Sequence, residues 1–136
     1  MDNFLKKLDH IGIAVNNIKE ALRFYQQILG FEAGEIEEVP QQGVRLAMLP
    51  LRDINIELLE PFSENSPIYK FLQKRGEGIH HLCFEVDNLE EILKKLSAHG
   101  IRFIDQQPRK GHGESLVAFL HPSSTHGVLI ELKQKI

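Results

Sequence analysis

The sequence predicts an α+β fold in which two β-α-β-β-β modules form a curved sheet around a shared cavity. The first half of the chain is repeated in the second. Residues 8–17 and 78–88 share a His, a Val five positions later, and a polar pair that opens a helical pattern. The two halves also end alike, because residues 54–59 and 128–132 each place one Glu in a largely aliphatic strand. One such module cannot cover both faces of its own sheet, so the two modules should pack side by side.

The first module opens with an alternating segment, which is typical of a β-strand. Within residues 5–15, aliphatic residues share one face, and His10 lies on the other face beside small residues. Apolar residues at helical spacing then predict a helix over 18–29 that ends at Gly30. Three more strands are expected, at about 31–38, 43–50 and 54–60.

The second module repeats this order after a short helical linker, residues 61–78, whose helix is predicted to start at Ser66 and Pro67. Its expected elements are a strand at 79–86, a helix from Leu89 to Gly100, and strands at about 101–105, 115–120 and 126–133. The basic, glycine-containing residues 107–113 should form an exposed, mobile loop. We therefore expect a single domain, 1–136, with half-modules at about 5–60 and 79–133.

Four residues of the repeat are candidates for a functional site: His10, Glu57, His81 and Glu131. Glu57 follows His10 by 47 residues, and Glu131 follows His81 by 50. A lone His in a strand is more often structural than a ligand. A carboxylate in an aliphatic strand, however, needs a partner, which a cation or an Arg side chain can supply. Because the same residue types recur at the same phase in both modules, we favour a metal site.

The bulk composition excludes other classes of function. The 136 residues include 16 Lys and Arg and 19 Asp and Glu. The resulting net charge of −3 does not indicate a basic surface that would bind nucleic acid or an anionic membrane. The apolar runs are far shorter than the roughly 20 residues that a membrane span needs. The single cysteine, Cys83, excludes an internal disulfide and is typical of a reducing compartment, so we expect a cytoplasmic protein.

These features resemble the vicinal oxygen chelate superfamily, which includes glyoxalase I, extradiol dioxygenases, fosfomycin-resistance proteins and the methylmalonyl-CoA epimerases. The resemblance is strongest to the epimerases and extends from Leu8 to Leu132. Its most distinctive segments are residues 56–61, 66–68, 74–81, 119–122 and 127–132.

The resemblance implies that His10, Glu57, His81 and Glu131 hold one divalent metal ion, for which cobalt, manganese, nickel, zinc and magnesium are all candidates. It also implies a small acyl-CoA substrate and a homodimer. Some members of the family carry Gln at the position of Glu57. Certain epimerases carry a Glu, proposed as a catalytic base, at the position of Leu46, and a leucine cannot fill that role.

The reaction implied by the resemblance is the epimerisation of (2R)- and (2S)-methylmalonyl-CoA, in which the proton at C2 is removed and returned through a metal-stabilised enolate. Epimerisation requires proton transfer at both faces of the planar enolate. We predict that Glu131 is one base and that Glu57 is the leading candidate for the other.

Three alternatives follow from the same superfamily. A glyoxalase-I-like lactoylglutathione lyase would use a comparable four-ligand site and the same enolate chemistry. An extradiol dioxygenase needs only two His and one carboxylate, which would leave Glu57 without a role. A metal-free small-molecule-binding protein of this fold should have apolar or aromatic residues where this chain has His and Glu.

Overall fold

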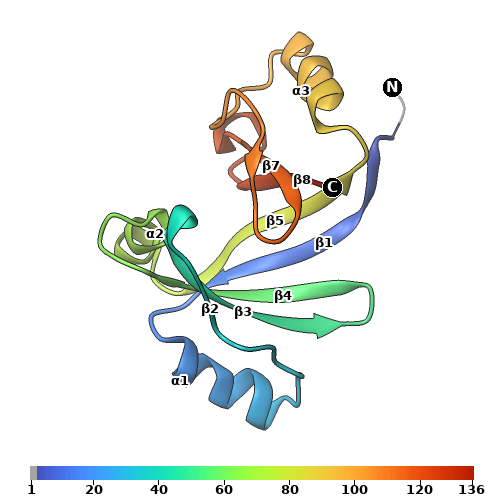
Figure 1. The fold of residues 1–136 in the computed structure, drawn as a ribbon. Coiled ribbons are helices and arrows are strands. Elements are labelled where there is room, and N and C mark those ends of the chain that lie inside the picture. Colours follow the sequence, from blue (N-terminus) through green and yellow to red (C-terminus); the bar gives the residue numbers. More distant parts are fainter. Residues whose placement is uncertain (1–2) are drawn as a thin grey trace. The chain divides into compact units, whose positions relative to one another are not determined.

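The computed structural model describes residues 3–136, which divide into two compact units. The N-terminal unit consists of residues 10–80. The C-terminal unit consists of residues 81–136 together with the described residues up to Asp9. Strand β1 (Leu5–Ala14) therefore begins in the C-terminal unit and ends in the N-terminal unit (Figure 1).

In the N-terminal unit the strands are hydrogen-bonded in the order β2-β3-β4-β1. The elements after β1 are α1 (Ile18–Leu22), a π-helical turn η1 (Arg23–Ile28), β2 (Glu37–Val39), a 3-10 turn η2 (Pro40–Gln42), β3 (Val44–Leu51), β4 (Ile54–Pro61) and α2 (Pro67–Arg75). Strand β4 is parallel to β1 and antiparallel to β3. Gly12 lies opposite Glu57 in the β1–β4 register, so His10, two residues earlier, shares a sheet face with Glu57.

The two faces of this sheet carry separate apolar clusters. On one face Leu58 packs with Ile18 of α1. On the other face Leu59 packs with Ile68 of α2. Since residues two apart on a strand share a face, Glu57 lies on the face that α2 helps to cover.

In the C-terminal unit the strands are hydrogen-bonded in the order β5-β8-β7-β6. The elements are β5 (Gly78–Val86), α3 (Leu89–Ala98), β6 (Arg109–Lys110), β7 (Ser115–Leu120), a 3-10 turn η3 (Pro122–Ser124) and β8 (Ile130–Lys135). One face of the sheet packs against α3 through a cluster that includes Phe84, Ala118 and Leu132. The alternate residues, including His81 and Glu131, therefore lie on the opposite face.

The repeated polar pairs cap the two helices that follow β1 and β5. The side chain of Asn17 accepts a hydrogen bond from the Glu20 N–H at 3.0 Å. The side chain of Asn88 accepts one from the Glu91 N–H at 3.1 Å. Each bond satisfies a donor that the first turn of a helix leaves unpaired, so both predicted helix starts are confirmed.

The predicted helix over 18–29 changes character after Leu22, where the π-helical turn begins. A π-turn takes more residues per turn than an α-helix, so later side chains rotate away from the apolar stripe. Tyr25 still packs against the sheet, whereas Ile28 and Leu29 are 74% and 55% exposed.

Two predicted strands were wrong in extent. The expected strand at 31–38 is reduced to β2, because only Glu37–Val39 pair with β3. The expected strand at 101–105 is reduced to a single bridge between Phe103 and Leu120. Conversely, the predicted loop at 107–113 contains strand β6, which pairs with β7. A strand requires a partner as well as a suitable composition, and the pattern of one segment does not reveal its partner.

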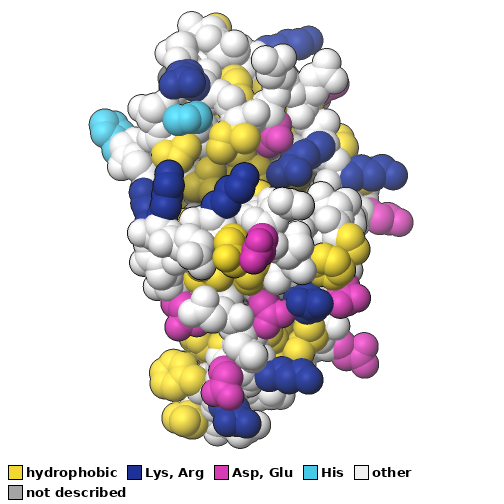
Figure 2. Space-filling view, turned by 90° about the vertical axis from the view of Figure 1, so that its left-hand side faces the viewer, with side chains coloured by type: hydrophobic (Ala, Val, Ile, Leu, Met, Phe, Trp, Pro, Cys, Tyr) yellow, Lys and Arg dark blue, Asp and Glu magenta, His cyan; other side chains and the backbone are white. Residues whose placement is uncertain are grey.

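No helix among residues 3–136 is long and apolar enough to cross a membrane. On the face drawn in Figure 2, acidic, basic and hydrophobic side chains are interspersed.

Candidate metal centre

His10 and Glu57 form a buried pair in the N-terminal unit. They come from the adjacent parallel strands β1 and β4, and the His10 Nε2 and Glu57 Oε1 atoms are 3.7 Å apart. The two residues are 4% and 7% exposed. Both side chains leave the same face of the sheet, as the alternation of residues in the two strands predicted.

His81 and Glu131 form the equivalent pair in the C-terminal unit. They come from β5 and β8, which are again parallel neighbours, and the His81 Nε2 and Glu131 Oε1 atoms are 3.2 Å apart. Both residues are buried. The sequence repeat thus reproduces the same strand relationship and the same pair of side chains in each unit.

The donor atoms of both pairs fit a divalent cation. Imidazole nitrogen and carboxylate oxygen are ligands of zinc and of other first-row divalent metals. Two atoms that bind one ion at about 2.1 Å and at right angles to each other lie about 3 Å apart. The separations of 3.2 and 3.7 Å are close to that spacing.

Phe119 is a neighbour of the site that no functional motif in the sequence marks. It lies directly opposite Glu131 in the β7–β8 ladder. Its ring also meets the His81 ring in an edge-to-face arrangement, with the centroids 5.8 Å apart. The only sequence signal for this role was the position of Phe119 in a strand, in the segment before His121 and Pro122 that carries part of the family resemblance.

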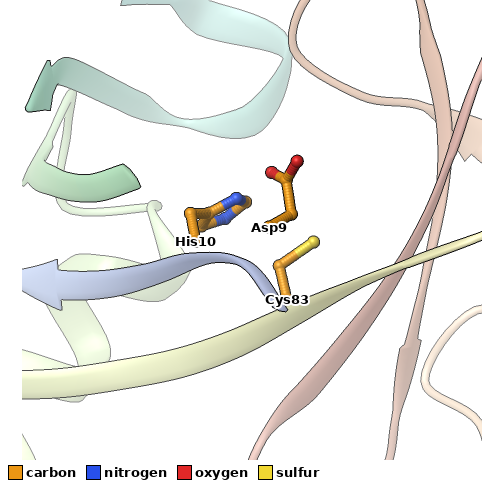
Figure 3. Close-up of side chains that lie close together, drawn as sticks. All are labelled: Asp9, His10 and Cys83. Atoms are coloured by element: carbon orange, nitrogen blue, oxygen red, sulfur yellow. The ribbon is translucent and has the colours of Figure 1, made fainter. Parts of the chain in front are cut away.

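The strands β1 and β5 bring further polar side chains together in the C-terminal unit. Asp9 and Cys83, labelled in Figure 3, have ligand-type atoms within 4.8 Å of one another. The Asp9 carboxylate also pairs with the Lys133 ammonium group, with Nζ and Oδ2 3.4 Å apart. Cys83 is fully buried.

Farther along the same face of β5, Glu85 lies between two ammonium groups. Its carboxylate is 3.2 Å from Lys6 Nζ and 3.3 Å from Lys135 Nζ. Burial alone would raise the pKa of Glu85, but the two lysines outweigh that effect and hold the pKa below its usual value. This ion-pair cluster connects the start of β1 to both β5 and β8.

Leu46 is buried in the apolar cluster that α2 covers, opposite Leu59. It is 1% exposed and has no group that accepts a proton. Any proton transfer in this protein must therefore use other side chains.

The chain matches the model of the Glyoxalase/Bleomycin resistance protein/Dioxygenase superfamily over residues 9–119. The matched region runs from the middle of β1 through most of β7 and so includes three of the four predicted ligands.

Named relatives extend this likeness to nearly the whole chain. The sequence is 42% identical to the mitochondrial methylmalonyl-CoA epimerase of Dictyostelium discoideum, over 95% of this chain and 78% of that protein. The methylmalonyl-CoA epimerase from Mycobacterium tuberculosis has a structure with a TM-score of 0.93 and 36% identity, over 100% of this chain and 92% of that chain.

A variant of the Streptomyces coelicolor methylmalonyl-CoA epimerase, solved in complex with 2-nitronate-propionyl-CoA, has a TM-score of 0.91 and 38% identity, over 96% of this chain and 95% of that chain. These likenesses confirm the predicted α+β fold class of two β-α-β-β-β modules.

Proposed function

Because this chain belongs to the Glyoxalase/Bleomycin resistance protein/Dioxygenase superfamily, we propose that it has the activity of its named relatives, the interconversion of (2R)- and (2S)-methylmalonyl-CoA. The observation that carries this proposal is the buried His–Glu pair found at the equivalent place in each unit. The substrate is inferred from the named relatives, and the two His–Glu pairs provide side chains suited to the chemistry of that substrate.

The four side chains His10, Glu57, His81 and Glu131 are proposed to hold one divalent ion, with the two modules acting as a single domain. When bound, the ion would stabilise the negative charge that develops on the thioester oxygen as the C2 proton leaves. Two neutral imidazoles and two carboxylates also balance the charge of a divalent cation. The same donors suit cobalt, manganese, nickel, zinc or magnesium to differing degrees.

Glu131 and Glu57 are proposed to move the proton at C2, one at each face of the planar enolate. In either direction the glutamate at one face accepts the C2 proton as a carboxylate, and the glutamate at the other face, carrying a proton, donates it to the enolate. Both are buried, and each lies beside an imidazole. This arrangement does not require an acidic residue at Leu46.

We further propose that the protein is a cytoplasmic homodimer. Its one cysteine, Cys83, is buried and forms no disulfide, which is compatible with a reducing compartment.

The test is an epimerisation assay on each pure epimer, with protein stripped by a chelator and then reloaded with one metal at a time. Stripped protein should lose activity and at least one metal should restore it. The matched variants are His81→Ala and His80→Ala. These residues are neighbours in β5, and their imidazoles leave opposite faces of the sheet. His80 packs against Phe71 of α2, with ring centroids 5.0 Å apart.

His81→Ala should abolish metal-dependent turnover, whereas His80→Ala should retain it. A glutathione–methylglyoxal hemithioacetal serves as the competing substrate. Faster turnover of that compound than of methylmalonyl-CoA would favour the lactoylglutathione lyase alternative. Full activity in protein shown to contain no metal would overturn the proposed metal dependence.

A further inference from the structure

We propose that Arg109 is a substrate-recognition residue, which binds an anionic group of the thioester substrate beside the His81–Glu131 pair. This inference rests on the proposed function and adds to it a residue outside the ligand set. The anionic group is either the carboxylate next to C2 or a phosphate of the coenzyme, and both would be recognised by the same guanidinium chemistry.

The strand register places Arg109 on the face of the sheet that carries the pair. Arg109 lies opposite Val117 in the β6–β7 ladder. Val117 and Phe119 are two residues apart on β7, and Phe119 lies opposite Glu131. Opposite residues share a face, and so do residues two apart, so Arg109 and Glu131 leave the sheet on the same side.

The Arg109 side chain is held toward that pair by two contacts. Its Nε is 3.2 Å from the Asp105 carboxylate. Its guanidinium carbon lies over the Phe119 ring, 5.6 Å from the centroid, and the same ring contacts His81. Asp105 is itself fixed, because its other carboxylate oxygen accepts the Phe119 N–H at 2.9 Å.

These contacts leave Arg109 suited to a ligand as well as to a structural role. The side chain is 48% exposed although its guanidinium is oriented by an acid and a ring. A guanidinium has four N–H donors on its two terminal nitrogens besides the one on Nε, and these donors match the two oxygens of a carboxylate or phosphate. A preoriented donor group loses less entropy on binding than a free one.

The hairpin that carries Arg109 is tightly built. The Gly111 N–H donates to the Ser115 carbonyl at 3.1 Å. The buried Ser115 hydroxyl donates to the His112 carbonyl at 3.0 Å. A Cβ at Gly111 would lie 2.6 Å from a Val117 methyl carbon, so only glycine lets the two strands approach this closely. The basic segment predicted as a loop is therefore a hydrogen-bonded support for Arg109.

The test compares Arg109→Gln with Lys110→Gln in the full-length, metal-loaded protein. Lys110 is the adjacent residue, lies opposite Leu116, and leaves the other face of the sheet. The two variants remove the same charge from the same hairpin. Arg109→Gln should raise KM for methylmalonyl-CoA about tenfold or more with a smaller change in kcat, and Lys110→Gln should change KM less than about twofold.

Two further ligands identify the anion. Methylmalonyl-S-pantetheine keeps the carboxylate but lacks the nucleotide phosphates, and propionyl-CoA keeps the phosphates but lacks the carboxylate. If Arg109 binds the carboxylate, Arg109→Gln should weaken the first ligand and not the second. If it binds a phosphate, the pattern should be reversed.

Arg109→Lys keeps the charge and should give a smaller increase in KM, and the thermal unfolding midpoint of each variant shows whether it is folded. Unchanged KM and Kd for all three thioesters in folded Arg109→Gln would overturn the inference, as would an equal effect of Lys110→Gln. Wild-type protein that neither binds nor epimerises methylmalonyl-CoA would instead refute the proposed function, and the role of Arg109 with it.

Discussion

Phe119 meets His81 edge to face, with ring centroids 5.8 Å apart and an interplanar angle of 77°. The contact limits the orientations of an imidazole that is proposed to bind metal. Groups that orient a ligand often change metal affinity by about tenfold or more when they are removed. Phe119→Leu should therefore weaken metal binding roughly tenfold, measured by competition with a chromophoric chelator.

The matched control is Phe71→Leu, which removes a similar edge-to-face contact with His80. Both substitutions delete an aromatic ring, but only the first deletes a ring beside a proposed ligand. Equal metal affinities in the two variants would mean that Phe119 contributes packing alone.

The two proposed bases are distinguished by exchange of the C2 proton with solvent deuterium. Glu57→Gln should slow exchange from one epimer by at least about 10²-fold, and Glu131→Gln should slow exchange from the other, since a general base typically contributes 10²–10⁴-fold. Glutamine keeps an oxygen donor for the metal, so metal content is measured in parallel by elemental analysis. If Glu57→Gln slows both epimers equally, Glu57 is a ligand and not a face-specific base.

Gly111 gives a prediction about stability. A methyl group there would lie 2.7 Å from the Ser115 hydroxyl oxygen as well as close to Val117. Gly111→Ala should lower the free energy of unfolding by about 1–3 kcal/mol, because a packed site resists added volume. Gly78→Ala is the control, since a methyl group added at Gly78 would meet no heavy atom of the described residues within 4 Å, apart from its own chain neighbours. That variant should change stability by less than about 0.5 kcal/mol. Urea unfolding of both variants tests the contrast.

Glu85 gives a prediction about pH. Its pKa is held below the usual value of 4.5 in the folded protein, although burial opposes this, because Lys6 and Lys135 stabilise the carboxylate. A depressed pKa contributes stability above the unfolded-state pKa, and that contribution is lost as the pH falls through the folded-state value. Glu85→Gln should therefore cost about 1–2 kcal/mol at pH 7. The difference from wild type should shrink below about pH 4.5.

Glu91→Gln is the control for this titration. Glu91 pairs with Lys95 on α3, but both side chains are more than half exposed. Its removal should change the free energy of unfolding by less than about 0.5 kcal/mol at any pH. Urea unfolding from pH 7 to pH 3 measures both variants, and a pH-independent effect of Glu85→Gln would show that the lysine pairs do not act through charge.

The strands that carry the candidate ligands were predictable because their signal is local and repeated. The alternation of residues in β1 and β5 predicted which face of the sheet carries His10 and His81. The aliphatic neighbours of Glu57 and Glu131 predicted that both carboxylates are buried. The repeat then related the two pairs, and each pair indeed lies on adjacent parallel strands.

The orientation of Arg109 was not predictable in the same way. Its segment is short, basic and rich in glycine, which is the composition of a loop. Strand β6 forms because β7 supplies a partner, and Arg109 is oriented because it contacts both Asp105 and Phe119. These are relationships between segments, and the alternation within one segment carries no information about them.

The division of β1 between two units has a consequence for how the chain is made. Residues 10–80 are synthesised before residues 81–136, so the first residues of β1 must wait for partners that are made later. Asp9 pairs with Lys133, 124 positions downstream. We therefore expect nascent chains to acquire protease resistance first in residues 10–80, with the first residues of β1 protected only after residues 81–136 have been made.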